Sequence, residues 1–313
     1  MSTLALVLVA AASAQAPPPP TFAVNVEGVY LDAFVTDGNR PVIGLTASDF
    51  ELRDNGVRQP VELVAVESLP LTTFLVLDAS GSVDGDKLVQ LQAAGRALLG
   101  GLRAGDEAAL VTFDQEVEVR VPPTSDRKRL ERAVGGILPG GATALYDALY
   151  AGTLLASGRG CSLLVLFTDG EDNLSWLDAA QVQRVLLESN VLVQAVGVMR
   201  NGEGASSATT AREALGRDNR GLFASRTGVE PPHVRTLRQM AEVTGGRFWT
   251  AASHENLADA FLAILEAMKT RYVLRFEPYR VKREGLHELE VRLVRGKGKV
   301  HCRKAYFVGP PAR

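Results

Sequence analysis

The 313-residue chain has little cysteine, little histidine and no excess of charge. Its 34 Lys and Arg residues nearly balance its 36 Asp and Glu residues, giving a formal net charge of −2. This balance gives no indication of nucleic-acid binding, and no charge block indicates an interaction tail. The two cysteines, Cys161 and Cys302, lie in strand-like runs that we expect in different domains. We therefore predict two free, buried thiols, with a disulfide in an oxidising compartment as the alternative.

The sequence also lacks the common catalytic motifs. It has no Gly-x-Ser-x-Gly elbow, no phosphate loop ending in Gly-Lys-Ser/Thr and no His-Glu-x-x-His helix. The four histidines all lie outside the oxygen-rich segments described below: His233, His254, His287 and His301. For a metal-activated water, only Asp169 or Glu171 remains as a general base. These absences favour binding over catalysis.

No apolar run is long and unbroken enough for a transmembrane helix, and the first sixteen residues carry no charge. Residues 4–12 are apolar, and Ala14-Gln15-Ala16 has the small-x-small form of a signal cleavage site. Pro17 to Pro20 would break a buried N-terminal helix, which is the alternative interpretation, and are better suited to a stiff spacer. We predict a signal peptide at 1–16, a proline-rich spacer at 17–20, and an exported protein, periplasmic or secreted.

Both ends of the remaining chain have β patterns. Residues 21–69 contain Asp54-Asn55-Gly56, a hairpin signal, between predicted strands at 50–53 and 57–66. Residues 270–309 contain three predicted strands, at 272–276, 286–294 and 300–308. Since each end alone is too small for a good core, we expect the two to pack into one small β-sandwich-like domain.

Residues 70–269 alternate between strands and helices. Short apolar runs at 74–77, 108–113, 163–167 and 191–198 are separated by segments with helical periodicity. The fold class is therefore α/β, a doubly wound, mostly parallel sheet wrapped by helices. Residues 199–232 do not fit the alternation. We interpret them as an insert on the ligand-binding edge that shapes partner choice, with a tolerated surface insertion as the alternative.

Three segments place hard oxygen ligands at the ends of predicted strands or the start of a helix. Asp78, Ser80 and Ser82 follow the first buried strand, Asp169 follows a later one, and Thr143 follows a glycine pair before a helix. In open α/β sheets, ligands bind beyond the carboxyl ends of the strands. Carboxylate and hydroxyl oxygens suit Mg²⁺, Mn²⁺ or Ca²⁺. Ser80 and Thr143 could alternatively be ordinary helix caps.

The Asp-x-Ser-x-Ser run, the later Gly-Gly-x-Thr and the Thr-Asp-Gly together resemble the metal-ion-dependent adhesion site of von Willebrand factor A domains. The resemblance covers about residues 71–268, and the flanking segments resemble an exported bacterial subgroup. It implies a Rossmann-like fold and one ion, Mg²⁺ or else Mn²⁺ or Ca²⁺. It also implies ligation by Ser80, Ser82 and Thr143, directly or nearly so, and by Asp78 and Asp169, directly or through water.

The charges of this set predict an incomplete shell. Two carboxylates only balance the ion and three hydroxyls add no charge, so water positions stay open. The resemblance implies that an Asp or Glu carboxylate of a protein partner fills one of them, as in adhesion. The alternatives are a scaffold stabilised by the ion and a metal-dependent hydrolase. We expect three nearby acids, Asp84, Asp86 and Asp172, in turns or caps and Asp114 in a hairpin turn, whereas Trp176 either rims the site or packs.

Overall fold

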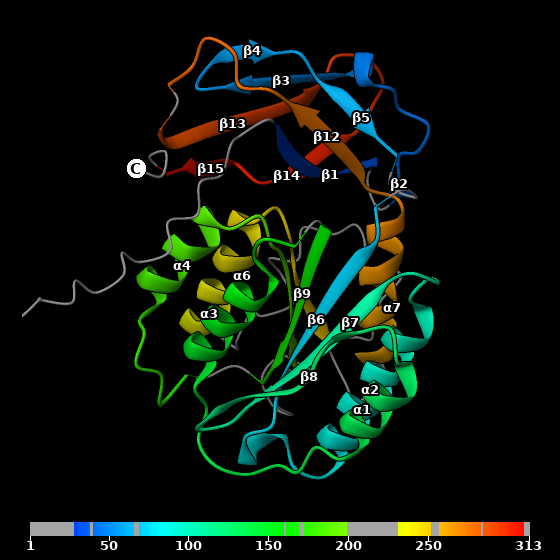
Figure 1. Cartoon of the computed structure of the whole chain (residues 1–313), viewed down its shortest axis with the longest axis vertical. Helices are drawn as coiled ribbons and strands as arrows, with labels where there is room; N and C mark the ends of the chain where they lie inside the picture. The colour runs from blue at the N-terminus through cyan, green and yellow to red at the C-terminus, as the bar shows by residue number, and fades with distance from the viewer. Residues whose placement is uncertain are drawn as a thin grey trace, which may run out of the picture.

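A six-stranded sheet forms the centre of the computed structural model (Figure 1), which describes residues 28–37, 40–65, 69–159, 161–169, 172–198, 231–251, 257–282 and 284–309. The strand order is β11-β10-β9-β6-β7-β8. The bounds are β6 Leu71–Asp78, β7 Glu107–Phe113, β8 Val117–Thr124, β9 Cys161–Thr168, β10 Leu192–Val198 and β11 Phe248–Ala251. Every neighbouring pair is parallel except β7 and β8, which are joined by the tight turn at 114–116. The predicted mostly parallel sheet is confirmed.

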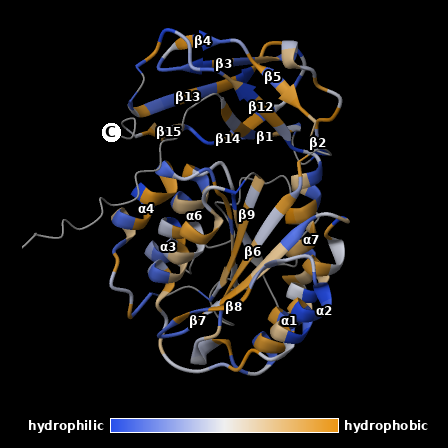
Figure 2. Cartoon of the chain, viewed as in Figure 1, coloured by the Kyte–Doolittle hydropathy of each residue, from blue (hydrophilic) through white to orange (hydrophobic). Residues whose placement is uncertain are grey.

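Helices cover both faces of this sheet because successive side chains of a strand point to opposite sides. Leu75 and Leu77 of β6 pack with α1 (Asp86–Gly101), α2 (Arg127–Gly135) and α7 (Leu257–Lys269). Phe74 and Val76 pack with α3 (Leu145–Ala156), α4 (Ala179–Glu188) and α6 (Pro232–Val243). Figure 2 shows the expected contrast, with apolar colour in β6 and β9 and both colours in helices such as α3 and α7. Within the described residues, no helix combines the length and the apolar character needed to cross a bilayer.

The sequence offers a capping residue before three predicted helices, Ser125, Asp178 and Ser253, and the structure agrees in part. Asp178 caps α4 as predicted, with a reciprocal bond between its backbone and Gln181. The cap of α2 is Asp126 rather than Ser125, because the Asp126 carboxylate accepts from the Arg129 amide. Two other predictions, the Ser253 cap and residues 199–230 of the insert predicted at 199–232, lie outside the described residues. Helix α6 begins at Pro232, so the predicted insert extends too far at that end.

The remaining strands form two further sheets, with orders β14-β1-β12-β5, to which β2 is added beside β1, and β15-β13-β3-β4. Their bounds are β1 Val29–Asp37, β2 Arg40–Pro41, β3 Phe50–Asp54, β4 Val57–Gln59, β5 Glu62–Val64, β12 Tyr272–Phe276, β13 Gly285–Leu293, β14 Lys299–Cys302 and β15 Ala305–Val308. Strand β1 pairs with β12 and β14, and β3 pairs with β13, so strands from the two chain ends lie side by side. Leu31, Leu52, Leu274 and Leu289 belong to one apolar core shared by both sheets. We call these two sheets the β unit; it lies at one end of the α/β domain (Figure 1).

Two of the predicted single strands are wrong because each is split. The run at 57–66 breaks at Pro60, which has no amide hydrogen to donate to a ladder, and β4 and β5 then join different sheets. The run at 300–308 breaks at 303–304, where the chain passes from β14 beside β1 to β15 beside β13. Hydropathy does not reveal the second crossing, because Val300 and Tyr306, on either side of it, belong to the same core.

A buried polar cluster joins three strands of the β unit. The Asp54 carboxylate on β3 lies 2.9 Å from His287 Nδ1 on β13 and accepts a 2.7 Å hydrogen bond from the Tyr306 hydroxyl on β15. Asp54 is fully buried and His287 nearly so. Burial, followed by the bond to Asp54, raises the pKa of Tyr306 well above its ordinary value, so the phenol stays a neutral donor. We call these residues the Asp54 cluster.

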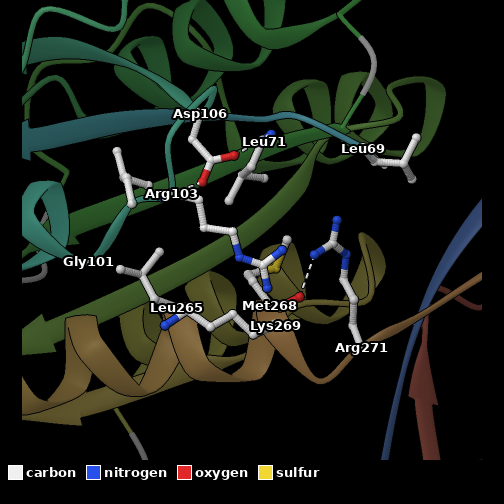
Figure 3. Close-up of a pocket in the computed structure, with 10 residues that line it drawn as sticks. Leu69, Leu71, Gly101, Arg103, Asp106, Leu265, Met268, Lys269 and Arg271 are labelled. Carbon is white, nitrogen blue, oxygen red and sulfur yellow. Dashed lines mark hydrogen bonds between the residues drawn. The ribbon is translucent and has the colours of Figure 1, made fainter. Parts of the chain in front are cut away.

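Arg271 connects the β unit to the α/β domain. Its side chain is 2% exposed and bonds to Asp32 of β1 at 2.6 Å, to the Met268 carbonyl at the end of α7, and to the Cys161 sulfur at the start of β9. Figure 3 shows this joint, with Arg271 pointing to the end of α7. The hollow here has a volume of ≈ 20 Å³, room for about one water molecule, so it is not a small-molecule site. Both cysteines are free and half-buried.

Candidate metal centre

The candidate residues lie at the carboxyl edge of the central sheet. Strand β6 begins shortly after β5, so it runs away from the β unit and ends in Asp78 at the far end of the α/β domain (Figure 1). Strand β9 is parallel to β6, with Leu77 opposite Phe167. The residue that follows β9, Asp169, therefore emerges at the same edge as Asp78. This is the edge where open α/β sheets bind ligands.

Asp78 is the buried base of the site. Its side chain is inaccessible to solvent, and its two oxygens accept from the Ser80 amide at 2.9 Å and from the Thr168 hydroxyl at 2.8 Å. Burial is the main cause that raises the pKa of Asp78 above its ordinary value, and the charge of Asp169 raises it further. The ionised form is therefore disfavoured, and a cation nearby would relieve that cost. Thr168 is a partner that sequence reasoning missed, although it stands in the Thr-Asp-Gly motif.

A chain of hydrogen bonds leads from the buried base to solvent. The Ser80 and Ser82 hydroxyls are 3.0 Å apart, and the Ser82 hydroxyl donates to Asp169 Oδ1 at 2.8 Å. Ser80 is buried, whereas Ser82 is exposed. Four of the five predicted residues are thus brought together in one cluster that opens to the surface at Ser82.

Lys87 also contacts this cluster, and sequence reasoning missed it. Its ammonium lies 2.8 Å from Asp169 Oδ2 and 2.9 Å from the Ser82 carbonyl oxygen. Only 19% of the Lys87 side chain and 8% of the Asp169 side chain are exposed. The available signal was its position in the first turn of the helix that follows the Asp-x-Ser-x-Ser run. Both oxygens of Asp169 are therefore engaged by donors of this chain.

Thr143 lies on the neighbouring loop, outside this chain of hydrogen bonds. The loop is tied to the Asp78 segment by two backbone bonds, from Gly140 N to Ala79 O at 2.8 Å and from Gly81 N to Gly141 O at 3.2 Å. Gly141 has φ +74°, a conformation that suits glycine, and this turn brings the two loops together. Thr143 itself is nearly buried, with its amide bonded to Asn173 Oδ1 at 2.8 Å.

The capping interpretation of the two hydroxyls is wrong. Ser80 stands at the start of the short 3-10 helix η3 (Gly81–Val83) without a side-chain capping bond. Helix α3 has Ala144 at its cap position, and its first amides at Leu145 and Tyr146 donate to Asp172 Oδ1. Asp172 therefore accepts hydrogen bonds from the first amides of α3, which agrees with its predicted turn or cap role. The Ser80 and Thr143 hydroxyls do not serve as caps.

The other acids near the site have local roles, as predicted. The carboxylates of Asp84 and Asp114 accept from the nearby amides of Gly85 and Glu116, and Asp86 lies in the first turn of α1. The packing alternative for Trp176 is wrong, because 95% of this residue is exposed.

The loop that carries Trp176 is firmly bonded to α3. Asp147 of α3 accepts from the backbone amides of Trp176 and Leu177, at 3.0 Å each. The Ser175 hydroxyl accepts from the Tyr146 amide at 2.9 Å, and the Leu174 amide donates to the Thr143 carbonyl. The indole is thus held out into solvent by a fixed backbone, beside the loop of Thr143.

The residues present fit a hard divalent ion. Every side chain of the set offers oxygen, two as carboxylates and three as hydroxyls, which is the donor chemistry of Mg²⁺, Mn²⁺ and Ca²⁺. Among the described residues, no three His, Cys, Asp or Glu side chains gather as a metal cluster. An ion at this edge would thus depend on hydroxyls as much as on carboxylates.

Comparison with known proteins places this edge within one domain family. Residues 73–171, which include all five predicted residues, match the family model described as von Willebrand factor type A domain. A "UPF0353 protein" of Nocardia farcinica is 25% identical over 217 residues, covering 64% of each chain. Inter-alpha-trypsin inhibitor heavy chain H2 of Sus scrofa is 24% identical over 175 residues, covering 50% of this chain and 18% of that protein. The chain thus spans 64% or less of the length of these relatives.

A solved structure, described as von Willebrand factor type A from Catenulispora acidiphila, has the same fold. It superposes with a TM-score of 0.51 at 14% identity, over 92% of this chain and 75% of that one. Together with the strand order and the two helical layers, this superposition shows the fold of the α/β domain. Residues 73–171 of that domain match the von Willebrand factor type A family.

Proposed function

We propose that this protein binds a partner through one divalent ion, Mg²⁺ or else Mn²⁺ or Ca²⁺, held at the carboxyl edge of the sheet. Ser80, Ser82 and Thr143 would hold the ion with Asp78 and Asp169, and an Asp or Glu carboxylate of a partner protein would complete the shell. When bound, the ion supplies a positive centre that attracts this carboxylate. The proposed setting is adhesion by an exported protein.

The hydrogen-bonded cluster of Asp78, Ser80, Ser82 and Asp169 carries this proposal. It converges on one edge from two strands that are far apart in sequence, and it runs from a fully buried carboxylate to an exposed serine. Burial raises the pKa of Asp78, and a cation at this edge would offset the cost of its ionised form. Two carboxylates neutralise the ion without saturating it, so the shell is suited to accept one more anionic ligand.

The surface around the cluster has the features of a protein contact. Trp176 and Leu174 are 95% and 48% exposed, on the loop that α3 holds in place. A tryptophan fixed in solvent by bonded backbone can bury a large area at little cost in conformational entropy, and tryptophan is enriched among residues that dominate binding energy. We propose that this loop contacts the partner beside the ion.

We assign binding rather than catalysis because the chain carries none of the common catalytic motifs and Asp169, the candidate base within the described residues, is assigned to the ion. A scaffold whose ion only stabilises the sheet edge is the remaining alternative. The partner experiment below separates it from a binder.

The metal is tested by titration calorimetry with MgCl₂ and MnCl₂ on chelator-treated protein. The wild type should bind one ion, and Asp78→Ala should show no binding heat while keeping its far-ultraviolet circular dichroism. Asp84→Ala is the matched control, since it removes a carboxylate from the same loop without touching the cluster. Equal binding by wild type and Asp78→Ala would remove this site from the proposal.

Partner binding is tested by capture from envelope extract on immobilised protein. Capture should require Mg²⁺, disappear with EDTA and with Asp78→Ala, and be competed by a glutamate-bearing peptide of the captured protein. Metal binding without metal-dependent capture would support the scaffold instead.

A further inference from the structure

Lys87 stands at a position where a lysine is poorly suited unless it has a local partner. It is in the first turn of α1, where the helix dipole favours anions and disfavours cations. A long flexible side chain also loses rotamer freedom when it is held in place. Yet its ammonium makes two close contacts, with Asp169 Oδ2 and the Ser82 carbonyl, and is only 19% exposed. These contacts offset both costs.

The net charge of the site is less negative when Lys87 is included. With an ion bound, Asp78 and Asp169 would contribute two negative charges, and the Lys87 ammonium adjacent to Asp169 would cancel one of them. Within the part of the chain that the structure describes, Asp78 accepts from neutral groups of Ser80 and Thr168. Among the described residues, Lys87 makes the only ion pair of the cluster with Asp169. A divalent ion that binds Asp169 must therefore share this carboxylate with an ammonium or displace it.

We propose that Lys87 is a built-in counter-ion that holds Asp169 in place without metal and lowers the affinity of the site for divalent cations. This inference rests on the proposed metal site, and it assigns Lys87 the role of setting metal affinity rather than that of a ligand. A partner carboxylate that joins the shell adds the negative charge that Lys87 cancels. Lys87 therefore weakens binding of the ion alone more than binding of the ion together with the partner carboxylate.

The position of Lys87 sets how strongly it lowers the affinity of the site for a divalent ion. Two like charges that share one carboxylate repel strongly at low dielectric, but a partly exposed lysine can swing its ammonium toward water. The penalty on metal binding is therefore limited to about a tenfold change in affinity at low salt, and screening reduces it further.

The test compares Mn²⁺ and Mg²⁺ binding by calorimetry in wild type, Lys87→Met and Lys87→Arg. Lys87→Met should bind either ion about tenfold more tightly, and Lys87→Arg should stay within about twofold, because it keeps the charge. Lys128→Met is the matched control, with the same loss of charge at an exposed residue near the start of α2. That helix start lies beside Arg103, away from the metal edge.

Thermal unfolding adds a readout that separates this role from a purely structural one. In EDTA, Lys87→Met should melt below wild type, because Asp169 and the Ser82 carbonyl lose their donor. In saturating Mn²⁺ the difference should shrink or reverse. A purely structural ion pair would lower the melting temperature equally in both. Lys87→Gln repeats the comparison with a polar side chain in case Lys87→Met folds poorly.

Each outcome decides between the two proposals. Metal binding by wild type with no gain in Lys87→Met or Lys87→Gln overturns the role of Lys87 and leaves the metal site standing. Binding by Lys87→Met alone supports Lys87 as the group that keeps metal out, and contradicts the proposed function of the wild type. Binding by neither protein overturns both.

Discussion

Replacing Asp54 with alanine should destabilise the β unit far more than an ordinary surface change. The substitution leaves the Tyr306 hydroxyl and His287 Nδ1 without their shared acceptor in a buried site, where His287 Nε2 already has no partner. A hydrogen bond to a charged group contributes about 1.5–3 kcal/mol, and two are lost. Breaking a buried pair by removing one member costs about 3–5 kcal/mol, which agrees with that sum. We expect a loss of about 4 kcal/mol in the free energy of unfolding.

The assay is urea unfolding followed by circular dichroism and tryptophan fluorescence. Tyr306→Phe removes one of the two bonds and should lose about 1.5–3 kcal/mol. The control, Glu288→Ala, changes an exposed neighbour on β13 and should stay within about 0.5 kcal/mol. Trp249 is buried in the α/β domain, so a change in circular dichroism that precedes its fluorescence change would locate the loss in the β unit.

Hydrogen exchange then tests whether the two chain ends form one cooperative unit. If they do, Asp54→Ala should raise exchange in β1 and β12 as well as in β3 and β13, because the four strands share one core. A loss below about 1 kcal/mol would refute the account of the Asp54 cluster. Faster exchange confined to the β3–β4 hairpin would refute the single unit.

Three further predictions concern other parts of the molecule. Burial raises the pKa of Cys161 to about 11 and that of Cys302 to about 12, so native alkylation should be very slow at pH 8 and quicken about tenfold per pH unit up to pH 10; rapid labelling at neutral pH would contradict this. Trp176→Ala should weaken partner capture by about thirtyfold and leave Mg²⁺ affinity and melting temperature unchanged, whereas undiminished capture would remove the loop from the interface. Gly152→Val should cost about 1–3 kcal/mol in urea unfolding, because a Cβ at Gly152 would lie 2.9 Å from Val76 Cγ2; an unchanged midpoint would show that α3 shifts freely.

The sequence predicts the edge of the sheet correctly because parallel strands end together. Asp78 and Asp169 each follow a continuous apolar run, so their meeting needs no knowledge of side-chain contacts. Lys87 and Thr168 could not be found that way. Their roles depend on where a long side chain of α1 and a hydroxyl at the end of β9 point, and neither direction follows from hydropathy. The metal itself stays a prediction.

The sequence predicts which segments form the β unit, but it does not predict their long-range contacts or where one strand ends. The Asn55-Gly56 turn is predictable because these residue types favour positive φ, and both adopt it in the structure. The contact of Asp54 with His287 joins residues far apart in sequence, and a lone buried histidine gives no signal of its partner. The division of 57–66 at Pro60 shows that a proline within an apolar run weighs more than the run itself.

The pairing of β1 has a consequence for how the chain is made. Val29 lies opposite Phe276, so about 250 residues are synthesised between the two, which takes about ten to fifty seconds at ribosomal rates. During that time both long edges of β1 lack the strands that later cover them, β12 and β14. The α/β domain, by contrast, has its last strand and helix by Lys269. A nascent chain stopped just after that point holds the complete carboxyl edge of the central sheet and a β1 strand with unpaired edges, which is a template for aggregation. Strands β12 and β14 cover these edges of β1 only after they have been synthesised.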